Sequence, residues 1–211
     1  MTFEEAMAAA ARIAADAATT TMRQYGSGHL TDEDDITPDL LATIRTSLTG
    51  QIGGLTWSAS VARHRAGRAA EEARTGADML IHVTLDTPTE KYSKGVLVQA
   101  KRFANDEYMS GREQTDLHEQ CRKMLERTPA AFVFNYMPGS MRVGSASRIV
   151  GASQRHLCSL CSWTTYRFFL ELFRCPVGDP RITSGLFADL PEQPDTLIIR
   201  ATGDLTEEPA P

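Results

Sequence analysis

Four polar residues near the middle of the chain have the types and the order that metal-assisted hydrolysis of a phosphodiester needs: Glu72, Asp78, Gln99 and Lys101. We expect Asp78 to bind a divalent cation directly, and Glu72 to bind it directly or through water. Mg²⁺ typically takes few carboxylates and keeps waters and phosphate oxygens as its other ligands. The cation would lower the pKa of its water and offset charge on the phosphate. Lys101, a compact positive charge, would orient the attacking water or neutralise the phosphate.

A β-hairpin is predicted to bring these residues to one end of a sheet. Residues 78–85 (DMLIHVTL) and 95–102 (GVLVQAKR) are rich in strand-forming residues, and a proline-containing turn separates them. Because side chains alternate along a strand, Gln99 and Lys101 share one face, while their neighbours face apolar packing. A polar set at the end of an apolar hairpin needs a reason, since sheets normally bury such faces with apolar side chains.

The stretch 72–78 (EARTGAD), followed by 98–102 (VQAKR), resembles the PD-(D/E)XK phosphodiesterase superfamily, which has the restriction-endonuclease-like fold. It is most similar to the variants that carry Gln-x-Lys, as Mrr-like nucleases do. The resemblance covers residues 55–146 and implies an α-β-β-β-α-β core. It also implies a nuclease that uses Mg²⁺, for which Mn²⁺ can substitute. The Glu-x-x-Thr-Gly-Ala-Asp form is similar to bacterial proteins associated with phage defence.

The resemblance assigns a role to each of the four residues. Asp78 matches the metal-binding aspartate, Gln99 and Lys101 match the (D/E)-x-K positions, and Glu72 matches the upstream acidic position. Glu71 adjoins Glu72, but the spacing to Thr-Gly-Ala-Asp favours Glu72. One departure is Gln99, whose amide oxygen is a poorer metal ligand than the usual carboxylate. Active members of the superfamily tolerate this exchange.

Four further residues are candidates for substrate binding. Arg102 follows the lysine at the end of its strand. Gln120 lies on the next helix, where some members of the superfamily have a glutamine that contacts the substrate or the lysine; a solvated helix flank is the alternative. Arg63 and Arg65 belong to a basic stretch, 63–74, that could contact phosphates. A plain solvated loop fits that stretch equally well.

Histidine and cysteine side chains offer two other candidate sites. His82 faces the same side of its strand as the aspartate, and a structural sheet histidine is favoured over a ligand. His156, Cys158 and Cys161, with Cys175 as a fourth ligand, would suit zinc in composition. Structural zinc usually needs two closely spaced ligand pairs, so buried thiols are favoured instead.

Length and composition indicate a soluble globular protein in a reducing cytoplasm. The chain has 211 residues, of which 42% are hydrophobic and 23% charged, with a net charge of −5 and four cysteines. Residues 1–54 carry −5, residues 55–182 carry +5 and residues 183–211 carry −5. A basic middle is compatible with a phosphate-binding face, and chance scatter is the alternative. No apolar run is long enough for a membrane span, and the N-terminus lacks the basic cluster of a secretory signal.

The predicted fold is α/β, with a restriction-endonuclease-like mixed central sheet flanked by helices and an added N-terminal helical segment. Further helices are expected over residues 2–18, 112–127 and 154–174, and further strands over 54–62, 131–136, 141–146 and 196–200. Thr37 is expected to cap a helix with Pro38 in its first turn, after an acidic loop at 32–35. The predicted units are 1–54 (N-terminal helices), 55–183 (nuclease-like core) and 184–211 (C-terminal strand and flexible tail).

The sequence therefore predicts a Mg²⁺-dependent nuclease that acts on nucleic acid, with double-stranded DNA favoured, in a bacterial anti-phage defence or repair system. Cutting both strands needs two sites, which favours a homodimer. The alternative is a catalytically degenerate protein of the same fold that serves as a nucleic-acid-binding or partner-docking subunit of a larger complex. The acidic flanks and the glutamine at position 99 favour this alternative.

Overall fold

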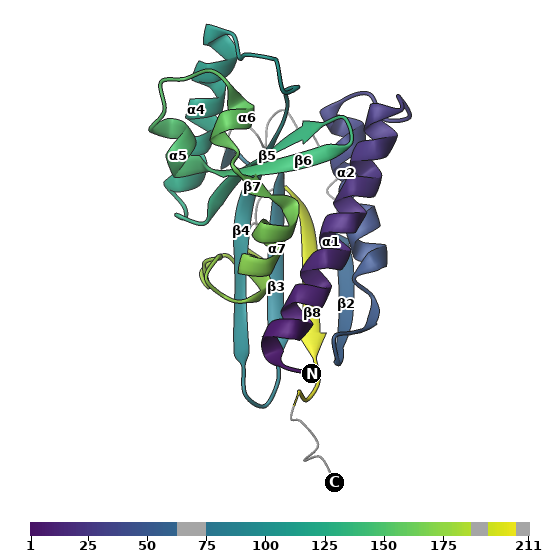
Figure 1. The fold of residues 1–211 in the computed structure, drawn as a ribbon. Coiled ribbons are helices and arrows are strands. Elements are labelled where there is room, and N and C mark those ends of the chain that lie inside the picture. Colours follow the sequence, from purple (N-terminus) through teal and green to yellow (C-terminus); the bar gives the residue numbers. More distant parts are fainter. Residues whose placement is uncertain (63–74, 187–193, 206–211) are drawn as a thin grey trace.

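The computed structural model describes residues 1–62, 75–186 and 194–205, and it has one mixed eight-stranded sheet with helices on both faces (Figure 1). The strand order is β1-β2-β8-β3-β4-β5-β6-β7. The prediction of an α/β protein with a mixed sheet, flanking helices and an N-terminal helical segment is confirmed. No helix within these three ranges is long and apolar enough to cross a membrane.

The elements have the following bounds. The strands are β1 (Gly50–Ile52), β2 (Leu55–Ala62), β3 (Met79–Asp86), β4 (Lys91–Arg102), β5 (Ala131–Met137), β6 (Ser140–Ser145), β7 (Trp163–Thr164) and β8 (Asp195–Thr202). The helices are α1 (Phe3–Gly26), α2 (Glu33–Ser47), α4 (Gly111–Leu125), α5 (Ala146–Val150), α6 (Leu157–Leu160) and α7 (Thr165–Phe173).

Helix α1 is longer than the predicted helix over 2–18, because it continues through the three consecutive threonines at 19–21. Thr19 and Thr20 donate their hydroxyls back to backbone carbonyls one turn earlier, at 2.9 and 3.0 Å. Thr21 is buried and donates to the Asp39 carboxylate of α2 at 2.8 Å. The run therefore joins two helices instead of ending one.

The predicted N-cap of α2 is wrong. The cap is Asp32, whose carboxylate accepts a hydrogen bond from the backbone N–H of Asp35 at 3.0 Å. The acidic run predicted as a loop forms the first turn, where negative charge favours a helix N-terminus. Thr37 instead lies buried inside the helix and shares a 3.1 Å hydrogen bond with the Tyr136 hydroxyl, and Pro38 follows it within the helix.

The β3–β4 hairpin is confirmed, and the C-terminal strand lies in the centre of the sheet. β3 pairs antiparallel with β4 from Met79 opposite Val98 to Asp86 opposite Lys91. β8 runs parallel to β3 and antiparallel to β2, so it joins the first strands to the hairpin (Figure 1). The strand predicted over 196–200 is therefore central to the sheet.

The long helix predicted over 154–174 is wrong. This segment forms α6, the short strand β7 and α7, because β7 pairs with the edge of β6 and Thr164 then caps α7 through the backbone N–H of Arg167. Three of the four aromatic residues of α7 are core residues: Phe168, Phe169 and Phe173 are fully buried.

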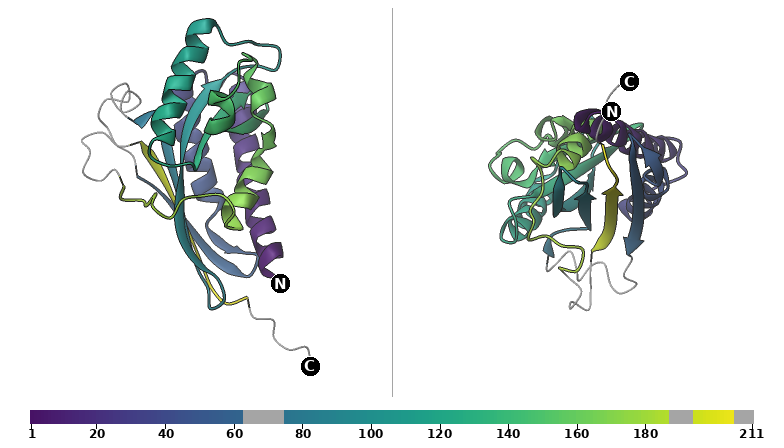
Figure 2. Two further views of the ribbon diagram at one scale, coloured as in Figure 1. Left: turned by 90° about the vertical axis from the view of Figure 1, so that its left-hand side faces the viewer. Right: turned by 90° about the horizontal axis from the view of Figure 1, so that it is seen from below.

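Two apolar clusters cover the two faces of the sheet. One packs α1, α2 and α7 against one face, and the other packs α4, α5 and α6 against the opposite face. In the turned view of Figure 2, the purple α1 and the green α7 lie along the same side of the sheet. Strand β4 contributes to both clusters: Val98 and Ala100 belong to the first cluster, and Leu97 belongs to the second.

Candidate functional site

Asp78 lies immediately before β3 and is held by the neighbouring strand β4. Its backbone N–H donates to the Val98 carbonyl at 2.9 Å. Its carboxylate oxygen Oδ2 accepts two short hydrogen bonds, from Gln99 Nε2 at 2.6 Å and from the Ala100 backbone N–H at 2.7 Å. The hairpin thus brings Asp78 and Gln99 into direct contact, and the contact fixes the position of the carboxylate.

The orientation of the Gln99 amide is set by its partners. Nε2 also donates to the Ala100 carbonyl at 3.1 Å, and the Gln99 side chain is fully buried. A carboxylate and a carbonyl can only accept hydrogen bonds, so the nitrogen and not the oxygen must be the atom that meets both of them. Any metal contact by Gln99 would therefore use Oε1, the other end of the amide.

The turn before Asp78 is packed tightly against α4. Gly76 has a φ of 70°, and a Cβ at this position would lie 2.2 Å from the backbone oxygen of Gln120. The Thr75 hydroxyl closes the turn by accepting a hydrogen bond from the backbone N–H of Ala77 at 3.2 Å. The Thr-Gly-Ala-Asp segment therefore fixes the distance between the start of β3 and the helix that carries Gln120.

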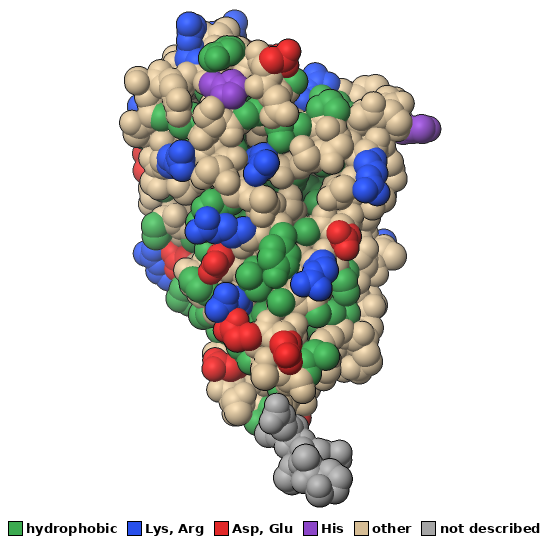
Figure 3. All heavy atoms as spheres, viewed as in Figure 1, with side chains coloured by type: hydrophobic (Ala, Val, Ile, Leu, Met, Phe, Trp, Pro, Cys, Tyr) green, Lys and Arg blue, Asp and Glu red, His purple; other side chains and the backbone are tan. Residues whose placement is uncertain are grey.

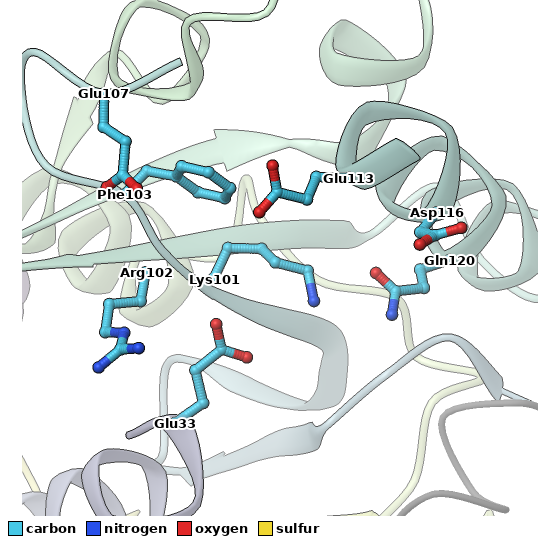
Figure 4. A pocket seen from close by; sticks show the side chains of 8 residues that line it. All are labelled: Glu33, Lys101, Arg102, Phe103, Glu107, Glu113, Asp116 and Gln120. Atoms are coloured by element: carbon cyan, nitrogen blue, oxygen red, sulfur yellow. The ribbon is translucent and has the colours of Figure 1, made fainter. Parts of the chain in front are cut away.

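Lys101 lines an open cavity of about 410 Å³ at this end of the hairpin. The other lining residues come from α2, the end of β4, the connection after it and α4: Glu33, Arg102, Phe103, Glu107, Glu113, Asp116 and Gln120. In Figure 4 the side chains of Lys101, Gln120 and Glu33 point into the same space. Lys101 and Gln120 are thus brought together, as expected for two groups that face one substrate.

The charge of the lining is mostly negative, because four carboxylates face two cationic side chains. The pKa of Glu113 lies below its ordinary value, chiefly through hydrogen bonds from the backbone and hydroxyl of Ser110 and further through the positive charge of Lys101. Such a lining attracts cations and repels a bare phosphate. A phosphodiester would therefore enter more readily together with a cation.

Two of the four predicted substrate-binding residues line the cavity, and the other two lie outside the described residues. Gln120 lines the cavity. Arg102 also lines it, but its guanidinium donates to the Thr31 carbonyl and lies 6.0 Å from the centre of the Tyr25 ring, so the N-terminal helices hold it. Arg63, Arg65, Glu72 and the neighbouring Glu71 fall in 63–74, outside the residues that the structure describes.

The histidine and cysteine candidates lie elsewhere. His82 is 5% exposed and hydrogen-bonds through Nε2 to the Ser93 hydroxyl at 3.0 Å. Cys161 is buried, as predicted. Cys158 is half-buried and accepts a hydrogen bond from Asn135, and Cys175 is exposed, so the prediction of buried thiols is wrong for these two. Cys158 and Cys161 therefore belong to the packing around α6.

The oxygen atoms of Asp78 and Gln99 are of the chemical type that binds Mg²⁺. Carboxylate and amide oxygens are the hard ligands that this ion prefers, and it tolerates few protein ligands when water and phosphate supply the others. Within the described ranges, no group of three or more His, Cys, Asp or Glu side chains could hold a metal by itself. A complete set would therefore have to draw on Glu72, on water or on the substrate.

Five of the eight residues that line the cavity were not predicted from the sequence: Glu33, Phe103, Glu107, Glu113 and Asp116. Glu113 belongs to a capping box with Ser110, a pattern that is readable from Ser-x-x-Glu before an amphipathic helix. Glu33 comes from the N-terminal segment, and no local pattern could place it beside Lys101. Comparison of the chain with models of known families, with curated proteins and with solved structures gives no match.

Proposed function

We propose that this protein is a metal-dependent nuclease of the restriction-endonuclease-like kind that hydrolyses phosphodiester bonds, with double-stranded DNA as the favoured substrate. One observation carries the proposal. Asp78 is held by Gln99 and Ala100 at the end of the β3–β4 hairpin, and Lys101, next along the same face of β4, lines an open cavity. The Asp78 carboxylate could bind a cation, and the Lys101 ammonium group on the neighbouring strand could contact a phosphate next to that cation.

Each residue has a defined part in this proposal. Asp78, with Glu72 and the Gln99 oxygen, would hold Mg²⁺ or Mn²⁺. The bound ion supplies an acidified water and positive charge against the phosphate. Lys101 would contact the phosphate oxygen or orient the water, because its side chain extends from β4 into the cavity (Figure 4). Gln120 would contribute hydrogen bonds to the same substrate.

The acidic lining gives this proposal a physical reason for metal dependence. Four carboxylates around two cationic groups would oppose the approach of DNA at low cation concentration. The proposal therefore includes a requirement for divalent cation in binding at the cavity as well as in hydrolysis.

Plasmid cleavage with Mg²⁺, with Mn²⁺ and with EDTA tests the proposal. We expect nicking or linearisation by the unchanged protein with either metal, none in EDTA, and none by Lys101→Ala or Asp78→Asn. Lys91→Ala is the matched control, because Lys91 lies at the opposite end of the same strand. Cleavage by Lys101→Ala at the rate of the control would overturn the proposal.

A specific observation favours a second candidate, a catalytically degenerate subunit that binds nucleic acid or a protein partner in a defence or repair complex. The Asp78 carboxylate oxygen already accepts two hydrogen bonds from protein groups, so the pair it forms with Gln99 is stable without a cation. This candidate predicts DNA binding that EDTA does not change and no cleavage with any metal. Size-exclusion chromatography with and without DNA would report a homodimer.

A further inference from the structure

An exposed aromatic residue directly follows a residue that lines the cavity. Tyr108 follows Glu107, a cavity-lining residue, in the connection between β4 and α4. Neighbouring Cα atoms are about 3.8 Å apart, so the Tyr108 backbone lies next to a residue that lines the cavity. Tyr108 is 67% exposed, whereas the other four tyrosines of the chain are buried or half-buried. A large ring left in water at the edge of a site is a candidate ligand contact.

The ring is held in position by a histidine that is itself fixed. The Tyr108 and His156 rings are 4.9 Å apart between centroids, with an angle of 38° between their planes. His156 Nε2 donates to the Asn105 carbonyl at 2.7 Å, and Nδ1 is hydrogen-bonded to the Ser159 hydroxyl. Both ring nitrogens are engaged, so the imidazole offers a fixed support for one face of Tyr108.

The backbone around Tyr108 is equally constrained. The Glu107 carboxylate accepts a hydrogen bond from the Ala104 N–H at 3.0 Å, and the Glu107 N–H donates to the Ala104 carbonyl at 3.2 Å. On the other side, Met109 is buried and its N–H donates to the Arg155 carbonyl at 2.9 Å. Tyr108 is therefore presented by a pre-formed loop, which lowers the entropy lost when a ligand binds.

Two basic residues are close to Tyr108 along the backbone: Arg155, whose carbonyl is bonded to the Met109 N–H, and Arg112, at the start of α4. Arg155 is exposed and makes no ion pair within the part of the chain that the structure describes. The side chain of Arg112 is 92% exposed and lies 3.8 Å from the Asp116 carboxylate, an ion pair open to solvent. Figure 3 shows basic, histidine and apolar side chains, with acidic side chains among them, on the end of the molecule that carries α4 and α6. Aromatic rings next to cationic groups are the arrangement that binds single-stranded nucleic acid, by stacking on bases and attraction of phosphates.

We propose that Tyr108 is a stacking platform for an unpaired base next to the phosphate that Lys101 contacts. The inference rests on the proposed function and narrows its substrate to DNA with a single-stranded or opened segment at the site of cleavage. The ring takes the base, Arg155 and Arg112 attract the flanking phosphates, and the cavity beyond Glu107 receives the next phosphodiester.

Binding of a fluorescein-labelled oligothymidylate with hydrolysis-resistant phosphorothioate linkages, measured by anisotropy with Mg²⁺ present, tests this inference without cleavage. We expect Tyr108→Ala to weaken binding by about 5- to 150-fold, the range for loss of one base stack. Tyr108→Phe keeps the ring and should bind like the unchanged protein. Tyr108→Leu, a matched variant of similar bulk without a ring, should bind like Tyr108→Ala. An oligomer of abasic sugar-phosphate units should bind equally to all four proteins.

The outcomes separate this inference from the proposed function. Equal binding of oligothymidylate by Tyr108→Ala and Tyr108→Phe, or by Tyr108→Leu and Tyr108→Phe, overturns the stacking platform and leaves metal-dependent cleavage untouched. Ring-dependent binding without cleavage by any metal overturns the nuclease and keeps the platform. If the unchanged protein binds neither single-stranded nor duplex DNA, both proposals fail.

Discussion

At the scale of single residues, the glutamine at position 99 affects both the stability of the metal-free fold and the affinity of the Asp78 site for a cation. In place of a second carboxylate, the chain has an amide that donates to Asp78 at 2.6 Å. A glutamate there would lose that hydrogen bond and put two negative charges in contact, which a divalent cation would relieve. The amide therefore stabilises the fold when no metal is bound and leaves fewer charges to hold the metal.

Gln99→Glu tests both effects, on stability without metal and on the response to Mg²⁺. In EDTA we expect its free energy of unfolding to fall by about 1–3 kcal/mol, the cost of unpaired buried polar groups. Mg²⁺ should then raise its melting temperature more than that of the unchanged protein, because the new carboxylate is a better ligand. Gln99→Met is the control, since it loses the hydrogen bond and gains no charge. Equal responses of all three proteins to Mg²⁺ would contradict a metal site at Asp78.

Lys94 is a second residue whose protonation affects the stability of the fold. Because side chains alternate along β4, it faces the opposite side of the sheet from Gln99, and it is not part of the cavity lining. It is 3% exposed, its ammonium donates to the Val177 carbonyl at 2.6 Å, and it lies 4.6 Å from the centre of the Tyr92 ring. Burial lowers the pKa of Lys94 to about 8 from 10.5, and the neighbouring Cys175 only partly offsets this. The unfolded chain therefore binds the proton more tightly than the folded chain.

This pKa predicts how stability depends on pH. Below pH 8 both states keep the proton and the cost of burying it is constant. As pH rises from about 8 to about 10.5, the folded chain releases the proton first, so Lys94 destabilises the fold less. The unchanged protein should then gain stability relative to Lys94→Met across this window, as measured by urea unfolding. The raised pKa of Tyr92 acts in both proteins, and Lys91→Met, exposed on the same strand, is the control. A difference that does not change with pH would contradict the lowered pKa.

At the scale of elements, the turn before β3 and helix α4 fit together as one unit. Gly76→Ala is expected to lower the free energy of unfolding by about 2–4 kcal/mol, because it combines a left-handed backbone with a clash against the Gln120 backbone. Gly28→Ala shares the left-handed φ without a neighbour within 4 Å, and Gly111→Ala has neither constraint. Urea unfolding should rank their costs as Gly76 above Gly28 above Gly111. A cost for Gly76→Ala no larger than that for Gly28→Ala would contradict the close packing.

Elements with a strong local pattern could be predicted from the sequence. The hairpin strands and β5 are short runs rich in apolar residues, and the helix after the hairpin repeats apolar residues at the helical period. The contact of Asp78 with Gln99 follows from that hairpin. Competing local signals caused the errors. The acidic run before Thr37 resembles a loop but caps α2, and the apolar segment 154–174 has helical spacing but pairs through β7 with a sheet edge. Local capping by Asp32 decided the first case, and pairing of β7 with β6 decided the second.

At the scale of the whole molecule, the chain end completes the sheet. No sequence pattern within residues 195–202 indicates which strands it will join, yet β8 lies between β2 and β3 and contributes the buried Leu197 and Ile199 to the main core. Without it, β1 and β2 have no hydrogen-bonded connection to the other strands of the sheet. The hairpin that carries Asp78 and Lys101 therefore depends on the end of the chain for one of its two neighbours.

A chain that ends after Pro194 tests this dependence. We expect it to lack cooperative unfolding and a native near-ultraviolet circular dichroism spectrum, because β3 would expose an unpaired edge and the core would lose one strand. A milder pair of variants uses the alternation of β8. Ile199→Ala, on the buried face, should cost about 2–5 kcal/mol, and Ile198→Ala, half-buried on the other face, should cost less. If the shortened chain unfolds cooperatively with the stability of the full chain, then β8 is an accessory strand, and the segment before it can form the Asp78 site alone.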